Sequence, residues 1–308
     1  MTAPAGHVGD VGDAGGAEGA GYASALAPVA GWPVPHAAVA VVGPDGVLAA
    51  TGETGRRQRV ASVTKAVAAL AFWVALEEEA IALDEPAGPE GSTVRHLLAH
   101  ASGLAFDRPA VMAAPGTRRI YSNVGFDVVA DLVAERAGMA FAAYLHEAVL
   151  APLGMADAAL EGSAAADLVA TADDLARFAR ELLAPTLVAP ETLALSTTVA
   201  FPGLAGVLPG IGAYDPLDWG LGVEVKGDKH PHWSGDATSP VTFGHFGATG
   251  SFLWVDPSRP VAALGLSGRG FGPWAMRAWP ALADAVLAVA DAGGAASSRP
   301  GWGPTGGQ

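Results

Sequence analysis

Strand-like apolar runs lie at both ends of this 308-residue chain, and helical and loop segments fill its middle. Runs at 37–42 and 47–51 flank Gly43-Pro44-Asp45-Gly46, a turn sequence typical of a β-hairpin. Further runs lie near the C-terminus, at 220–225, 241–247, 251–255 and 261–266. Strands so far apart in sequence bury their apolar faces by joining one sheet. The pattern therefore predicts an α+β protein with an antiparallel sheet built from both chain ends and covered by helices.

The middle of the chain is expected to form a mainly helical lobe. Segments 127–136 and 172–183 carry apolar residues at helical spacing, and a last helix is expected from about Pro273 to Val289.

We expect one domain over residues 31–292, made of two lobes. The lobes are a sheet lobe, 31–61 with 218–292, and a helical lobe, 62–217. Residues 1–30 and 293–308 are rich in Gly, Ala, Ser and Pro, and this composition predicts flexible terminal segments.

Lysine is scarce in this chain: three lysines stand against fourteen arginines, and Lys65 follows Ser62 by three residues. Arginine stays protonated in proteins, so a base that must lose its proton cannot be arginine. Val63, Val67 and Leu70 recur at helical spacing, which places Ser62 at a helix start and Lys65 one turn later on the same face. The pair predicts a serine nucleophile activated by a lysine amine. Because an S-x-x-K pair arises by chance in about one such chain in seven, other segments must support it.

Three further segments support this interpretation. Residues 93–104 read TVRHLLAHASGL, residues 121–123 read YSN with the only asparagine of the chain, and residues 243–250 read FGHFGATG. Together with Ser62 to Lys65, and in this order, they resemble the serine β-lactamase and penicillin-binding-protein superfamily. The resemblance is to its class C-like branch, which includes D,D-carboxypeptidases, D-aminopeptidases and family VIII esterases, and it runs from about Val34 to Val289.

The resemblance implies a role for each matched residue. Ser62 would be the acylated nucleophile, Lys65 its base and Tyr121 the second proton-transfer group. Asn123 would hydrogen-bond the acyl side chain of the substrate and help to hold Lys65. The backbone amides of Ser62 and Ala248 would form the oxyanion hole. The resemblance also implies the β-lactamase/transpeptidase-like fold, with the site at the boundary of the two lobes.

The third motif departs from the usual K-T-G of the lactamases, because His245-Phe246-Gly247 stands there. A mostly neutral imidazole supplies less positive charge for the carboxylate of a β-lactam than lysine does. Gly247 is retained, as expected where a strand must come close to the substrate backbone. We therefore expect hydrolysis of small esters or amides, with His245 and Gly247 contacting the substrate. The alternatives are a β-lactamase or D,D-carboxypeptidase, or a catalytically idle binding protein on the same fold.

No metal or other cofactor is expected. The chain has no cysteine, which excludes a thiol nucleophile and a zinc-thiolate site, and it lacks the G-x-S-x-G, H-E-x-x-H and Walker motifs. His230 and His232 could suggest a metal, but Pro231 lies between them, and a flexible surface loop over the active-site mouth is favoured. His96 and His100 stand four residues apart on an expected helix, where packing and hydrogen bonding are favoured.

The charge of the chain limits its partners. A formal net charge of −14 opposes binding to nucleic acid or to an anionic membrane, and no apolar stretch reaches the length of a membrane span. The N-terminus does not resemble a secretory signal, so we expect a cytoplasmic protein whose partner is a small ester, amide or peptide substrate. The sequence leaves the oligomeric state open.

Overall fold

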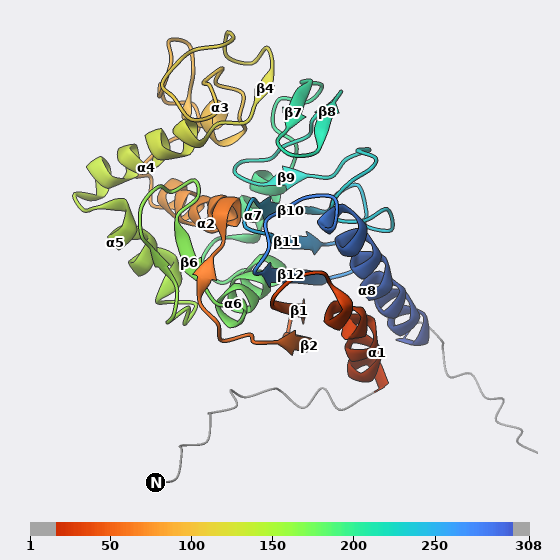
Figure 1. Ribbon diagram of the computed structural model, residues 1–308. Helices are drawn as coiled ribbons and strands as arrows, with labels where there is room; N and C mark the ends of the chain where they lie inside the picture. Colours follow the sequence, from red (N-terminus) through yellow and green to blue (C-terminus); the bar gives the residue numbers. More distant parts are fainter. Residues whose placement is uncertain (1–16, 298–308) are drawn as a thin grey trace, which may run out of the picture.

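A six-stranded sheet forms the centre of the computed structural model, which describes residues 17–297 (Figure 1). The strands are β1 (Ala37–Gly43), β2 (Gly46–Gly52), β9 (Glu224–Val225), β10 (Phe243–Gly247), β11 (Ser251–Asp256) and β12 (Val261–Ser267). They lie in the order β2-β1-β12-β11-β10-β9, and every neighbouring pair is antiparallel. In the β1–β12 pair, Ala37 lies opposite Ser267. The two ends of the chain therefore meet in one sheet, and the predicted α+β class is confirmed.

Helices cover both faces of this sheet. They are α1 (Ala17–Leu26) and α8 (Ala275–Ser297) on one face and α6 (Ala172–Leu183) on the other. Val39 and Val41 of β1 pack in the cluster that contains α1 and α8, whereas Ala40 and Val42 pack in the cluster that contains α6. Successive strand residues point to opposite faces, and both faces are buried here. This is why the strands read as nearly continuous apolar runs.

Both terminal segments that composition predicts to be flexible are partly helical. α1 packs against α8 and β2 and leads into a 3₁₀ turn, Ala27–Gly31. Tyr22, Leu26 and Val29 are buried, and their spacing of four and three residues is that of one helix face. The expectation for 1–30 is therefore wrong from Ala17 onward. The expectation for 293–308 is wrong for 293–297, which continue α8. Residues 1–16 and 298–308 lie outside the described residues.

The segment between the sheet strands is mainly helical, as predicted. Its helices are α2 (Thr64–Glu77), α3 (Val94–Leu98), α4 (Asn123–Ala137), α5 (Phe141–Leu145) with a π-helical turn (His146–Leu150), and α7 (Pro190–Thr197), in addition to α6. Its short strands are β3 (Gln58–Arg59), β5 (Ala159–Leu160) and β6 (Leu168–Ala170) in one sheet, and β4 (Arg119–Ile120), β7 (Gly206–Leu208) and β8 (Gly212–Tyr214) in another. Within residues 17–297, no helix is both long enough and apolar enough to cross a membrane.

The strand expected at 220–225 shortens to the two residues of β9. Gly222 has a φ of 106°, and a Cβ added there would lie 2.3 Å from the Cβ of Ala69 on α2. The backbone can pass this close to α2 only at a glycine. The chain therefore turns over the helix before it joins the sheet.

Candidate active site

Ser62 lies in a 3₁₀ turn, Ala61–Val63, that continues directly into α2. The preceding residue, Ala61, has a φ of 44°, a left-handed conformation that is uncommon for a residue with a side chain. The end of β10 comes very close to this turn, because a Cβ added at Gly247 would lie 2.3 Å from Ser251 Oγ and 2.5 Å from the carbonyl oxygen of Val60. Packing against the chain before Ser62 therefore already requires glycine at 247.

Lys65 is fully buried on the first turn of α2. Its Nζ donates hydrogen bonds to Asn123 Oδ1, at 2.6 Å, and to the carbonyl oxygen of Ala165, at 2.9 Å. Burial lowers the pKa of Lys65 to about 7, and the negative charge of Asp127 opposes part of this fall. A lysine with this pKa is partly neutral near pH 7 and can accept a proton.

The N-terminus of α4 supplies the acceptor that holds Lys65. Ser122 is the N-cap, its Oγ accepting from the amide of Gly125, and Asn123 begins the helix. The Asn123 amide donates to the carbonyl oxygen of Phe106 at 2.7 Å, which ties the helix start to the loop before it. Asn123 therefore holds Lys65 in the way that the resemblance implies.

Sequence reasoning missed Asp127. Its carboxyl group is half-buried, accepts a hydrogen bond from Ser163 Oγ at 2.7 Å, and raises the pKa of Lys65. Burial in turn raises the pKa of Asp127 itself. No signal in the sequence pointed to this contact, because the predicted helix began at residue 127, whereas α4 begins at Asn123 and so brings Asn123 and Asp127 onto one helix face.

Tyr121 and His245 face each other at the end of the site. His245 Nδ1 lies 2.7 Å from the carbonyl oxygen of Phe246, which can only accept, so Nδ1 carries the hydrogen. Nε2 is then an acceptor for the Tyr121 hydroxyl, 3.3 Å away. Burial, and next the charge of Lys65, lower the pKa of His245 to about 3, so the imidazole is neutral at pH 7. Burial raises the pKa of Tyr121 well above its usual 10, although a hydrogen bond from the Ser62 side chain acts in the opposite direction.

An aromatic cluster packs against the side chains of Tyr121 and His245. The Trp219 ring meets Tyr121, His245 and His100 edge to face, at centroid distances of 5.7, 5.5 and 4.8 Å. His100 lies beyond the end of α3, with a φ of 54°, and its Nδ1 accepts from the amide of Ser122. The packing and hydrogen-bonding role favoured for His100 is confirmed. The shared helix face with His96 is wrong, because the helix ends between the two residues.

The segment 226–242 is held by buried charges on its inner side. Glu224 accepts hydrogen bonds from Trp233 Nε1, at 2.7 Å, and from His232 Nε2, at 3.1 Å, and pairs with Lys229 at 3.3 Å. The opposing cations, Lys229 first, outweigh burial and lower the pKa of Glu224 to about 2. His232 is buried, so the expected surface loop is wrong for this histidine, whereas His230 is exposed and pairs with Asp236.

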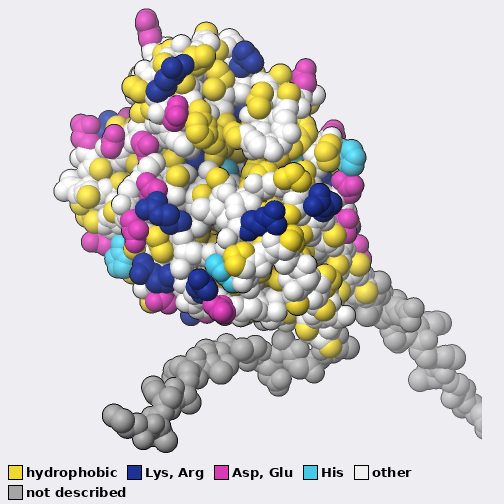
Figure 2. All heavy atoms as spheres, in the orientation of Figure 1, with side chains coloured by type: hydrophobic (Ala, Val, Ile, Leu, Met, Phe, Trp, Pro, Cys, Tyr) yellow, Lys and Arg dark blue, Asp and Glu magenta, His cyan; other side chains and the backbone are white. Residues whose placement is uncertain are grey.

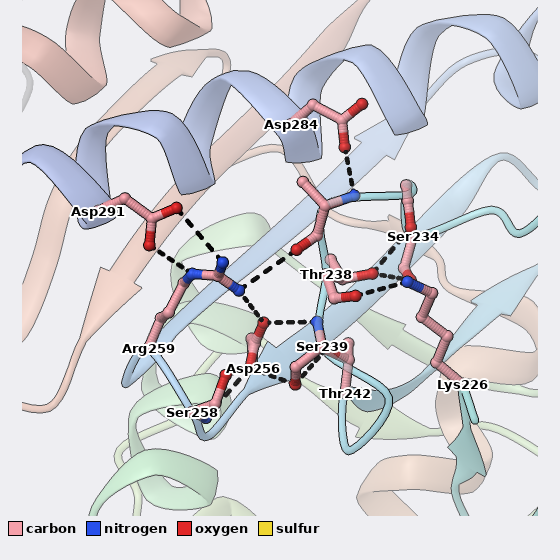
Figure 3. Close-up of polar contacts among 12 residues, drawn as sticks. Lys226, Ser234, Thr238, Ser239, Thr242, Asp256, Ser258, Arg259, Asp284 and Asp291 are labelled. Atoms are coloured by element: carbon pink, nitrogen blue, oxygen red, sulfur yellow. Dashed lines mark hydrogen bonds and ion pairs between the residues drawn. The ribbon is translucent and has the colours of Figure 1, made fainter. Parts of the chain in front are cut away.

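A second network anchors the far side of the same segment (Figure 3). Lys226 Nζ donates to the carbonyl oxygens of Asp236 and Thr238, and Asp256 accepts from both the amide and the hydroxyl of Ser239. These contacts fix a segment that has no regular element of its own. Among residues 17–297, no group of three or more His, Cys, Asp or Glu side chains could hold a metal ion.

A cavity of about 920 Å³ opens beside Tyr121. The loop residues 105–108, the segment 118–121 and parts of the β7 region line it. Tyr121 therefore contacts both this cavity and the buried side chains of Lys65 and His245. Ala248, the other residue of the implied oxyanion hole, follows β10 directly and is exposed.

Comparison with known proteins agrees with this arrangement. Residues 30–288 match the family model described as Beta-lactamase, and the chain belongs to that family. A comparison with curated proteins finds no match. Among solved structures, a β-lactamase from Mycobacterium bovis is similar with 53% identity and a TM-score of 0.85; the match covers 86% of this chain and 99% of the other.

Two more distant structures share the fold. A penicillin-binding protein homologue from Pyrococcus abyssi is 18% identical with a TM-score of 0.68, over 85% of this chain and 76% of the other. The hydrolase EstCE1, which has promiscuous acyltransferase activity, is 17% identical with a TM-score of 0.68, over 87% and 97%. The predicted β-lactamase/transpeptidase-like fold is confirmed.

Proposed function

We propose that this protein is a serine hydrolase that forms an acyl-enzyme on Ser62 and acts on small esters or amides. The observation that carries the proposal is the buried amine of Lys65, with a pKa of about 7 and two neutral oxygens as its acceptors. An amine that is partly neutral near pH 7 and stands one turn from a serine can take the proton of that serine.

The contacts of Lys65 suggest how the proton moves. A neutral amine has two N–H bonds, and both are directed at Asn123 Oδ1 and Ala165 O, so its lone pair stays free. As the Ser62 oxygen bonds to the substrate carbonyl carbon, its proton passes to Lys65 Nζ. Tyr121, hydrogen-bonded to Ser62, then gives a proton to the leaving alcohol or amine and regains one from Lys65. Water attacks the acyl-enzyme along the reverse route, releasing the acid and Ser62.

The neutral side chain of His245 favours the proposal that the substrates are esters or amides and not β-lactams. At a pKa of about 3 it carries no positive charge for a β-lactam carboxylate, and it is too weak a base to take the serine proton. Its Nε2 instead orients the Tyr121 hydroxyl.

β-Lactam hydrolysis is the second candidate, because the Mycobacterium bovis structure, 53% identical, is described as a β-lactamase. A carboxylate-binding cation other than residue 245 would be needed for efficient turnover.

The direct test is intact-protein mass spectrometry after treatment with a fluorophosphonate, together with hydrolysis of p-nitrophenyl acetate. Wild type should gain one adduct, and Ser62→Ala should gain none and lose hydrolysis. Ser258→Ala is the matched control, since its hydroxyl contacts Asp256 in the network of Figure 3. An adduct that persists in Ser62→Ala would contradict the assignment. A wild type that neither gains an adduct nor hydrolyses the ester would favour the idle binding protein.

A further inference from the structure

Two arginines that line the cavity beside Tyr121 have no side-chain partner among the described residues. Arg108 and Arg118 are exposed, and neither side chain forms an ion pair or a hydrogen bond with another residue in the range 17–297. The contrast with Arg119 is sharp, because that guanidinium is buried and donates to the carbonyl oxygens of Leu217 and Ala200, both at 2.8 Å. Arg119 holds the backbone in place, whereas Arg108 and Arg118 remain available to a ligand.

The same cavity presents apolar surface next to these cations. The Phe106 ring stacks on Tyr121 with a centroid distance of 5.8 Å and an interplanar angle of 24°, yet 47% of Phe106 is exposed. Met112 and Val207, also in the lining, are 59% and 54% exposed. Exposed large apolar side chains that gather at a cavity mark a binding surface.

The charge of this cavity is opposite to that of the whole molecule. The chain has a formal net charge of −14, but the lining holds Arg108 and Arg118 against one carboxylate, Asp107, with Arg119 committed to the backbone. Figure 2 shows basic side chains standing among hydrophobic ones on the upper part of the molecule, over the segment that Figure 1 draws in yellow. An unpaired guanidinium fork is suited to bind a carboxylate through two parallel hydrogen bonds.

We propose that the substrate carries an anionic group, such as a carboxylate, at the end of an apolar segment, and that Arg108 and Arg118 bind it while Phe106, Met112 and Val207 contact the segment. This inference rests on the proposed hydrolase function and narrows its substrate class. It also assigns the cation for a substrate carboxylate, which His245 cannot supply, to the segment before Tyr121.

Matched chromogenic esters test the charge preference. On the acyl side, p-nitrophenyl hexanoate, the p-nitrophenyl monoester of adipic acid and p-nitrophenyl 6-aminohexanoate have equal chain lengths and end in a neutral, anionic or cationic group. On the leaving-group side, 3-hexanoyloxy-4-nitrobenzoate carries the carboxylate, and 2-nitrophenyl hexanoate is its neutral counterpart. The anionic member of one series should have the highest kcat/KM, and the series in which it does so shows which part of the substrate lies in the cavity.

For each variant we compare kcat/KM for the anionic ester with kcat/KM for the neutral ester, and the ratio of the two measures the charge preference. In Arg108→Gln/Arg118→Gln this ratio should fall about tenfold, as expected for the loss of partly exposed charge-assisted hydrogen bonds. Asp107→Asn should raise the ratio, because it removes the opposing charge. Arg277→Gln is the matched control, since this exposed arginine of α8 lies outside the cavity lining. Raising the salt concentration from about 0.05 M to about 0.5 M should reduce the preference in wild type, because salt screens exposed charges.

The outcomes separate this inference from the proposed function. Ester hydrolysis that depends on Ser62 but shows no charge preference in either series would overturn the anion subsite and leave the hydrolase intact. A preference that Arg108→Gln/Arg118→Gln retains would also overturn it. Absence of all hydrolysis and of labelling at Ser62 would overturn the proposed function itself.

Discussion

All three lysines of this chain are buried, but they lie in two regions that use the residue in different ways. At the lobe boundary, Lys65 has two neutral oxygens as its hydrogen-bond acceptors. In the segment 226–242, Lys229 pairs with the buried carboxylate of Glu224 and donates to the carbonyl oxygens of Asp218 and Val225. Lys226 donates to two carbonyl oxygens of the same segment. All three lysines thus occupy buried positions, and Lys65 is the one that stands one turn from Ser62, the proposed nucleophile.

Lys65 and Lys229 differ in which neighbouring groups compensate the positive charge of the amine. Burial lowers the pKa of both Lys65 and Lys229, but at Lys229 the charge of Glu224 is the first opposing cause, through a direct contact. At Lys65 the opposing charge is that of Asp127, whereas the hydrogen bonds of Nζ go to Asn123 Oδ1 and the carbonyl oxygen of Ala165. A buried lysine paired with a carboxylate stays a cation that holds structure, whereas one with neutral acceptors can give up its proton.

The largest effect is expected for Lys65→Met. Ester hydrolysis should fall by about 10³-fold, since the base is lost. The free energy of unfolding at pH 7 should fall by less than about 2 kcal/mol or rise. A pKa of about 7 instead of 10.5 corresponds to about 5 kcal/mol against burying the charged form. Removing this cost offsets the loss of two hydrogen bonds of about 1–3 kcal/mol each. Kinetics and urea denaturation measure the two quantities.

Two controls accompany this variant. Lys65→Arg keeps the charge but should also be inactive, because guanidinium cannot accept the proton. In wild type, kcat/KM should rise with pH as Lys65 loses its proton, with a midpoint near pH 7, and level off above it. A Lys65→Arg enzyme with most of its activity, or a flat profile between pH 5 and 9, would remove the distinction between the two regions.

The opposite pattern is expected for Lys229→Met. This substitution leaves the Glu224 carboxylate without its cation, so the free energy of unfolding should fall by about 3 kcal/mol. Below the melting temperature, kcat should stay within about threefold of wild type, because Lys229 does not touch the reacting atoms. Lys226→Met is the matched control and should cost less, about 1–2 kcal/mol, since the direct hydrogen-bond acceptors of Lys226 are carbonyl oxygens and not a carboxylate. If both variants lost the same free energy of unfolding, the ion pair between Lys229 and Glu224 would not be what distinguishes Lys229 from Lys226.

The smallest effect is expected for His245→Lys, which places a further buried lysine beside Tyr121. A fixed charge about 4 Å from a carboxylate is worth up to about 4 kcal/mol at an effective dielectric of about 20, before desolvation. Repulsion from Lys65 and the cost of burial reduce this, so kcat/KM for nitrocefin should rise only a few-fold. His245→Gln is the neutral control. Wild-type nitrocefin hydrolysis at about 10⁶ M⁻¹s⁻¹ or above would show a true β-lactamase instead.

Local periodicity predicted much of the fold correctly. α6 has the predicted bounds, Ala172–Leu183, and the first hairpin extends its predicted strands by one or two residues at their ends. The errors have a common cause, which is that packing against a distant element decides the outcome. α1 is stable because Tyr22 and Leu26 pack against α8 and the sheet, and the strand expected from 220 begins only after Gly222 because α2 lies against the chain there.

The sequence by itself determined which residues stand at the candidate site: Ser62 and Lys65 share one helical turn, and Tyr121 and Asn123 adjoin a second helix start. Those relations are local, because backbone geometry sets the spacing of residues within a turn. Only the tertiary structure decided the protonation states of Lys65 and His245, the position of Asp127, and the placement of Arg108 and Arg118 at one cavity. The pKa of a side chain depends on its burial and on the charges around it, and residues far apart in the chain supply both.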